Sequence, residues 1–298
     1  MDWPDALELG PVTVLTGENG GEYPHGNSVL VRGADRTALL DPSLTVAERG
    51  AVPVAPDLVV LSHVHEDHLP GLSLFPETPV HAHGDDRIGL ESLDGLCQIY
   101  GMSDESEAIW RPVLVEQFRY RARPDAIPFA DGDRIDLGGV EIQVLHTPGH
   151  TRGHSALLVP EASAVFLGDI ELTGFGPYYG DAWSDLEDFE RSLERCRQID
   201  AEHFITFHHK GTVSGRDKFL EMLDKFAGAI TRRENAMLEY LKQPHTLDEM
   251  VDTRFIYRPH VENNFVLSVE RRSAILHLER FVKQGRVREL EAGLWQVA

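Results

Sequence analysis

Short runs of aliphatic and β-branched residues dominate the first 170 positions of the chain. Such runs favour an extended backbone, and most of them are closed by Gly, Pro, Asp or Ser, which favour turns. Eight runs therefore predict strands: VTVLTG (12–17), SVLVRG (28–33), RTALLD (36–41), LVVLS (58–62), PVHAH (79–83), VEIQVLH (140–146), SALLV (155–159) and AVFLG (164–168). Helices are sparser in this part, with one candidate near 85–96.

The pattern changes after residue 184. Five apolar residues recur there at helical spacing, with charged residues between them: Leu186, Phe189, Leu193, Cys196 and Ile199. Ser184 or Asp185 is a suitable N-cap for this helix. A strand, HFITFHH (203–209), and a helix over 216–227 follow. This mixture predicts packed sheets flanked by helices, an α/β fold.

The last 70 residues indicate a second, smaller unit. They predict a helix at 232–242, a turn at Pro244, a helix at 246–257, a longer helix ending at 285, and a short hairpin at 286–298. This order resembles a winged-helix unit. We therefore expect two domains, 1–228 and 229–298, with the second packed on the first or on another subunit, where it shapes access to a site.

The charge of the chain is distributed unevenly. The 298 residues include 49 acidic and 28 basic residues, a net charge of −21. Residues 229–298 hold 11 basic and 10 acidic residues, so the first 228 hold 17 basic and 39 acidic residues, a net of −22. Such an acidic domain favours solubility and disfavours binding along a polyanion, so we expect no nucleic-acid partner.

The two cysteines and the N-terminus bear on the compartment. Cys97 and Cys196 are far apart and form no CxxC motif, so a disulfide framework is not expected. The opening MDWPDALELG has neither a basic start nor a long apolar stretch, which argues against a signal peptide. No apolar run is long enough to span a membrane. We expect a cytoplasmic protein with no membrane partner.

The segment VLSHVHEDHL (60–69) places three histidines and two carboxylates within six residues, directly after an apolar strand. Imidazole and carboxylate groups are natural ligands of divalent metal ions. His63 and His65 are two residues apart and point to the same side of an extended chain. Asp67 and His68 follow where the chain turns into Leu69-Pro70, so they approach from another direction. One loop can thus serve two metal ions; the alternative is a solvated polar loop.

Other titratable residues also follow predicted strands, where rigid scaffolds present functional groups. The segment LHTPGHTRGHS (145–155) contains His146, His150 and His154. Asp169 ends an apolar strand, where an unpaired carboxylate would be costly to bury. His208 and His209 end another strand.

This combination resembles the metallo-β-lactamase-fold hydrolase superfamily, in its glyoxalase II, lactonase and endoribonuclease-like branch. The resemblance covers about residues 10–215 and implies an αββα sandwich with the metals at one edge of the sheets. It assigns His63, His65 and His150 to a first metal, and Asp67, His68 and a late histidine to a second, with Asp169 bridging both. His209 is favoured as the late histidine, although the doubled histidine replaces the usual Gly-His context. The tail resembles the winged-helix segment attached to some members.

The resemblance implies two divalent ions, for which zinc is the first choice and iron or manganese the alternatives. Two ions can share a hydroxide that attacks an electrophilic carbonyl or phosphorus. Asp169 would hold the ions together, and Asp67 would hold the second ion and orient the hydroxide. These two carboxylates are therefore the catalytic candidates.

The loop LTGFGPYYGDAWSDL (172–186) is rich in aromatic residues and glycine and follows Asp169. Phe175, Tyr178 and Tyr179, with His208, are candidates for a substrate pocket in which a tyrosine donates to the leaving group; packing of the loop against the sandwich is the alternative. For His146 and His154 we expect supporting or structural roles, and for His81 and His83 a solvated strand end. His25 is either structural or part of the pocket.

The expected substrate is a small ester-like molecule, a lactone or a thioester. No basic residue lies between Leu172 and Glu190, so the loop offers apolar walls and no phosphate clamp. True β-lactamases of the superfamily that the chain resembles usually lack the bridging aspartate, so the resemblance implies that Asp169 argues against β-lactam hydrolysis. The alternatives are a metal-dependent phosphodiesterase or ribonuclease and a winged-helix nucleic-acid-binding regulator. A homodimer is compatible with the sequence.

Overall fold

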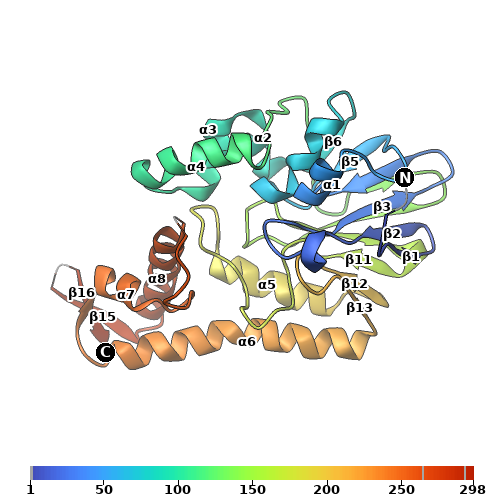
Figure 1. The fold of residues 1–298 in the computed structure, drawn as a ribbon. Coiled ribbons are helices and arrows are strands. Elements are labelled where there is room, and N and C mark those ends of the chain that lie inside the picture. The colour runs from blue at the N-terminus through green and yellow to red at the C-terminus, as the bar shows by residue number, and fades with distance from the viewer. Residues whose placement is uncertain (1–2, 264, 292) are drawn as a thin grey trace.

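The computed structural model describes residues 3–263, 265–291 and 293–298 (Figure 1). Two β-sheets pack face to face, and helices cover both outer faces. This four-layer arrangement confirms the predicted αββα sandwich.

The first sheet contains seven strands in chain order. They are β1 (Leu7–Leu9), β2 (Val12–Leu15), β3 (Ser28–Arg32), β4 (Thr37–Leu40), β5 (Leu58–Val60), β6 (Val80–His83) and β7 (Ile127–Phe129). The pairs from β1 to β4 are antiparallel and those from β4 to β7 are parallel. The carboxyl ends of β4 and β5 therefore lie at the same edge of the sheet.

The second sheet has the order β13-β12-β11-β10-β9-β8. Its strands are β8 (Arg134–Asp136), β9 (Glu141–His146), β10 (Ser155–Val159), β11 (Ala164–Phe166), β12 (His203–Ile205) and β13 (Thr212–Ser214). Only β11 and β12 among these pair in parallel. All eight predicted strands of the first 170 residues are present. The inner faces of both sheets form one core, in which Val29 and Val60 of the first sheet and Leu157 and Ile205 of the second are buried.

Helices cover each outer face. Those on the first sheet are α1 (Leu44–Arg49), α2 (Ile88–Glu91), α3 (Leu93–Tyr100) and α4 (Asp104–Glu116); those on the second are α5 (Leu186–Arg197) and α6 (Arg216–Tyr240). Short 3₁₀ turns are η1 (Glu18–Gly20), η2 (Glu66–His68), η3 (Pro70–Leu74), η4 (Gly84–Asp86) and η5 (Pro160–Ala162). As predicted, α5 begins after Asp185, whose side chain accepts a hydrogen bond from the Asp188 amide.

Two helical predictions for this part differ from the structure. The candidate helix at 85–96 is divided into η4, α2 and α3, because Ser92 is extended and its hydroxyl accepts a hydrogen bond from Gly95 N to start α3. Helix α4 was not predicted. It buries only Leu114 fully, so the chain shows little helical periodicity of apolar residues there.

The C-terminal part is built around the end of α6. It contains β14 (His245–Thr246), α7 (Leu247–Thr253), α8 (Val266–Lys283), β15 (Val287–Glu291) and β16 (Leu294–Val297), with a three-stranded sheet of order β14-β16-β15. Its own core is Met237, Leu241, Met250, Ala274, Leu278, Phe281 and Val287. The winged-helix assignment of this order stays a prediction.

The predicted helices at 216–227 and 232–242 are one helix of 25 residues. The predicted boundary between residues 228 and 229 therefore falls inside α6. Gly228 does not break the helix, and only the Arg232 side chain lies near the place where its Cβ would be. The same helix therefore contributes residues to the core of the second sheet and to the core of the C-terminal part.

Side chains of α8 also tie the C-terminal part to the sandwich. Arg280 forms ion pairs with Glu190 of α5 and Glu234 of α6, and Lys283 pairs with Glu187. The Tyr179 hydroxyl lies 3.0 Å from His277 Nε2.

Within the described ranges, no helix combines the length and the apolar character needed to cross a membrane.

Candidate active site

The candidate ligands gather because they follow strands that end at the same edge of the sandwich. His63 follows β5, and Asp41 follows the neighbouring β4. In the second sheet, Asp169 follows β11, and His208 follows its parallel neighbour β12. The TPGH turn after β9 adds His150.

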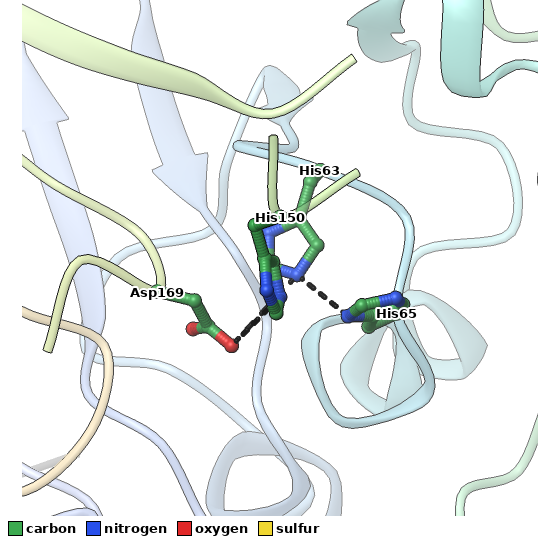
Figure 2. A group of neighbouring side chains, drawn as sticks. All are labelled: His63, His65, His150 and Asp169. Atoms are coloured by element: carbon green, nitrogen blue, oxygen red, sulfur yellow. Dashed lines mark hydrogen bonds and ion pairs between the residues drawn. The ribbon is translucent and has the colours of Figure 1, made fainter. Parts of the chain in front are cut away.

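A first cluster consists of His63, His65, His150 and Asp169, all buried (Figure 2). His63 Nε2 lies 3.1 Å from His65 Nδ1. Asp169 Oδ2 lies 3.2 Å from His150 Nε2 and 3.9 Å from His63 Nε2. These four ligand atoms face one point.

A second cluster consists of Asp67, His68 and His208, which are also buried. His208 Nε2 lies 2.8 Å from Asp67 Oδ2, and His68 Nε2 lies 3.8 Å from Asp67 Oδ1. Asp169 Oδ1 lies 3.2 Å from His68 Nε2. The two oxygens of Asp169 thus face different clusters, as a bridging carboxylate requires.

Each of the five histidines in the two clusters has one ring nitrogen that points away from the cluster, and each of these outward nitrogens lies close to a polar atom. The partners are Ser62 Oγ for His63 (3.1 Å), Asp181 Oδ2 for His65 (3.1 Å), Asp41 Oδ2 for His68 (2.7 Å), the Tyr178 carbonyl for His150 (3.0 Å) and the Gly21 carbonyl for His208 (2.9 Å). Hydrogen-bond partners of this kind fix the orientation and tautomer of a metal-binding imidazole and leave the lone pair of its inward nitrogen free to bind a metal ion. The contact of His65 with Asp181 is an ion pair without hydrogen-bond geometry.

The chemistry of the inward atoms fits a pair of cations. Of the described side chains, His68, His150 and Asp169 each have a buried inward atom with no hydrogen-bond partner: Nε2, Nε2 and Oδ1. Burial and the neighbouring His68 hold the pKa of His63 well below its usual range, so its imidazole is neutral. Burial opposes ionisation of Asp169, but His68 and His150 hold its pKa well below the usual range. Burial opposes protonation of His65, His68 and His208, but the neighbouring carboxylates raise the pKa of His65 to about 9, that of His208 to about 10 and that of His68 well above its usual range. These three rings would therefore release protons on binding a metal ion. Imidazole and carboxylate groups together form a ligand set that suits Zn²⁺.

Comparison with known proteins agrees with this geometry. The family model of the metallo-beta-lactamase superfamily matches residues 23–209, more than half of the chain. The chain belongs to this superfamily. This membership confirms the resemblance identified from the sequence and the predicted class of metal-dependent hydrolase.

Individual members of the superfamily resemble the chain to different extents. The acyl-coenzyme A thioesterase MBLAC2 of Bos taurus is 31% identical over 203 residues, which cover 59% of this chain and 70% of that protein. A beta-lactamase-like protein 2 homolog of Caenorhabditis elegans is 29% identical over 203 residues, covering 67% of this chain and 57% of the relative. A metallo-beta-lactamase family protein of Thermus thermophilus shares the fold along almost its whole length, with a TM-score of 0.71, 24% identity, and coverage of 97% and 99% of the two chains.

A cavity of about 600 Å³ opens onto both clusters of this metallo-β-lactamase superfamily protein. Phe175, Tyr178 and His208 line it, as the sequence indicated. Tyr179 does not: its side chain is buried against Arg233 and His277. Successive residues of this loop point in different directions, so one of the two tyrosines faces the cavity and the other the protein interior.

The structure places His208, rather than His209, in the second cluster. His209 is exposed and has a φ of +58°, and its side chain belongs to neither cluster. The His208 ring is directed inward by its hydrogen bond to the Gly21 carbonyl. The structure therefore favours His208 over His209, the sequence-based choice, as the candidate for the late ligand.

The remaining histidines lie outside the two clusters. His154 supports Asp169: its Nε2 accepts a hydrogen bond from the Asp169 amide, and its Nδ1 donates to the Thr147 carbonyl. Burial lowers the pKa of His154 to about 3, so it stays neutral in this role. His83 and His146 stack on each other at 4.1 Å between ring centroids, and His25 contacts Thr45.

Sequence analysis missed Asp41 and Asp181. Asp41 could have been identified from the sequence, because it ends a predicted strand just as Asp169 does. No sequence pattern marks Asp181, since it lies in a loop and comes close to His65 only through the tertiary fold.

Replacing Asp41 with Asn should lower metal affinity and turnover about 10- to 100-fold, as loss of an outer partner commonly does. Asp41 Oδ2 accepts a hydrogen bond from His68 Nδ1, and an amide NH₂ at that position would present a second donor to the ring. Metal analysis and hydrolysis assays would measure the loss. Asp57→Asn is the matched control, because Asp57 accepts from the Thr37 amide on the same sheet and away from the site. Equal metal content and turnover in the two variants would refute the role of Asp41.

Proposed function

We propose that the chain is a dinuclear metal-dependent hydrolase of small carboxylic thioesters. The observation that carries this proposal is Asp169, whose two oxygens face two separate ligand clusters beside a largely apolar cavity. The similarity to an acyl-coenzyme A thioesterase supports a thioester substrate ahead of a lactone.

The proposed ligands follow the two clusters. His63, His65 and His150 would hold one ion, Asp67, His68 and His208 the other, with Asp169 shared between them. When bound, two divalent ions lower the pKa of a shared water molecule and polarise the substrate carbonyl. Zinc is the expected metal, and elemental analysis of the purified protein tests it against iron and manganese.

The protein's own residues select and orient the substrate. Three further acidic residues border the cavity, Glu66, Glu171 and Asp181, and Lys210 is the one lysine or arginine among the described residues that line it. An anionic substrate would meet repulsion there, and the −22 charge of residues 1–228 would slow the approach of a nucleic acid. The Tyr178 ring packs edge-on against His150 at 5.5 Å, so it would contact a substrate carbonyl bound next to the first cluster.

A substrate panel tests this function. We expect kcat/KM to be highest for acyl thioesters of N-acetylcysteamine, lower for alkyl lactones, and lowest for a β-lactam, a phosphodiester and single-stranded RNA. Chelation should remove the activity, and elemental analysis should find two metal ions per chain. Turnover of RNA or the phosphodiester above every thioester and lactone, and lost in an Asp67→Ala variant, would overturn the proposal.

A further inference from the structure

Four aromatic side chains form a continuous surface on one side of the cavity. Trp110 and Phe265 lie 6.1 Å apart between ring centroids, Phe265 and Tyr257 6.1 Å, and Tyr257 and Phe175 5.3 Å. All four line the cavity. We call this set, Trp110, Phe175, Tyr257 and Phe265, the aromatic wall.

Three segments that are distant in sequence supply the wall. Trp110 comes from α4, Phe175 from the loop after Asp169, and Tyr257 and Phe265 from the connection between α7 and α8. In Figure 1 the C-terminal part lies below α3 and α4, on the same side of the sandwich. The cavity is therefore completed by the C-terminal part and does not belong to the sandwich alone.

Buried charged groups hold the wall in place. The Glu270 carboxylate, 1% exposed, accepts hydrogen bonds from the backbone amides of Phe255, Ile256 and Tyr257 at 2.7–3.2 Å. Arg233 donates to the Phe175 carbonyl at 2.8 Å and stacks on the Phe175 ring. A surface ordered in this way before binding loses little freedom when a ligand covers it.

The cavity lining combines two kinds of surface. Residues of the candidate metal clusters and further acidic groups supply polar surface, and the aromatic wall supplies apolar surface. Phe175 is 37% exposed, so apolar area remains to be covered by a ligand. A molecule that carries both an electrophilic carbonyl group and a hydrocarbon chain matches both kinds of lining.

We propose that the aromatic wall binds the acyl chain of the substrate, and that Tyr257 and Phe265 set the chain length accepted. This inference rests on the proposed function only for the position of the carbonyl at the metal clusters. It assigns a specificity role to the C-terminal part and leaves the thiol portion of the thioester outside the wall.

The first test measures kcat/KM for N-acetylcysteamine thioesters from acetyl to decanoyl. For the unmodified protein we expect a rise of about fourfold per added methylene over several carbons, and then a plateau. A Tyr257→Ala/Phe265→Ala variant should flatten this dependence on chain length. Leu267→Ala is the control, because Leu267 lies on α8 and is 53% exposed outside the cavity; it should keep the dependence.

A second variant guards against loss of folding as the explanation. Phe265→Trp enlarges the wall, so it should move the plateau to shorter chains, a shift that general destabilisation would not produce. An unchanged plateau in Phe265→Trp together with an undiminished slope in the double alanine variant would overturn the inference. So would rates that follow the size of the thiol and ignore the acyl chain.

A binding experiment separates this inference from the proposed function. Calorimetry with metal-replete protein and neutral ketone analogues of the N-acetylcysteamine thioesters, in which CH₂ replaces the sulfur, should show affinity that increases from butanoyl to decanoyl and loses that increase in the double alanine variant. This result without thioester hydrolysis would refute the proposed function and keep the acyl-chain site. Thioester hydrolysis together with an affinity that is independent of chain length would support the proposed function and refute the acyl-chain site.

Discussion

Replacing Asp169 with alanine should lower thioester turnover about a thousandfold, equivalent to roughly 4 kcal/mol of transition-state stabilisation, and should reduce the bound metal to one ion or fewer per chain. Asp169 presents one oxygen to each cluster, at 3.2 Å from His150 and 3.2 Å from His68. Its removal takes away the carboxylate whose two oxygens face the two clusters. The measurements are elemental analysis and initial rates on the same preparation.

The fold should survive this change, because Asp169 lies just beyond the end of β11 and its side chain contributes nothing to the core between the sheets. Circular dichroism and the thermal unfolding midpoint would verify this. Asp188→Ala, which removes a partly exposed carboxylate near the start of α5, is the matched control and should keep full activity. Two metal ions and undiminished turnover in Asp169→Ala would show that the bridging role is wrong.

The second large effect on turnover is expected at His208, the first of two consecutive histidines. His208→Ala should cost at least a hundredfold in turnover, roughly 2.7 kcal/mol, together with about one metal ion per chain. His208 Nε2 lies 2.8 Å from Asp67, and its removal leaves that buried carboxylate without its closest partner. Metal content and kcat/KM, measured for the variant and the unmodified protein, would quantify both losses.

His209→Ala is the built-in control for this experiment, since it removes the adjacent imidazole from an exposed position. We expect its metal content to be unchanged and its turnover to stay within about threefold of the original. The reverse pattern, with His209→Ala inactive and His208→Ala active, would return the late ligand to His209.

Several features could be read from local sequence because local physics produces them. The strand runs, the Asp185 cap and the helical spacing of α5 depend on backbone preferences over a few residues. The family resemblance carried by the sequence motifs also implied that His63, His65, Asp67, His68, His150 and Asp169 belong to one site, and the position of these motifs after predicted strands agrees with that expectation. The acidic charge and the resemblance to a family of metal-dependent hydrolases were also evident from the sequence.

Other features depend on which groups the fold brings together. His208 points into the second cluster because the Gly21 carbonyl, 187 residues away, accepts its hydrogen bond, and no local pattern distinguishes it from His209. Tyr178 faces the cavity and Tyr179 faces His277 for the same kind of reason. Residues 254–257 are predicted as helix, yet α7 ends at Thr253, and the segment is bound to Glu270 of α8. The direction of a side chain at the end of an element is set by partners distant in sequence, so only the tertiary structure distinguished His208 from His209 and brought the aromatic wall together.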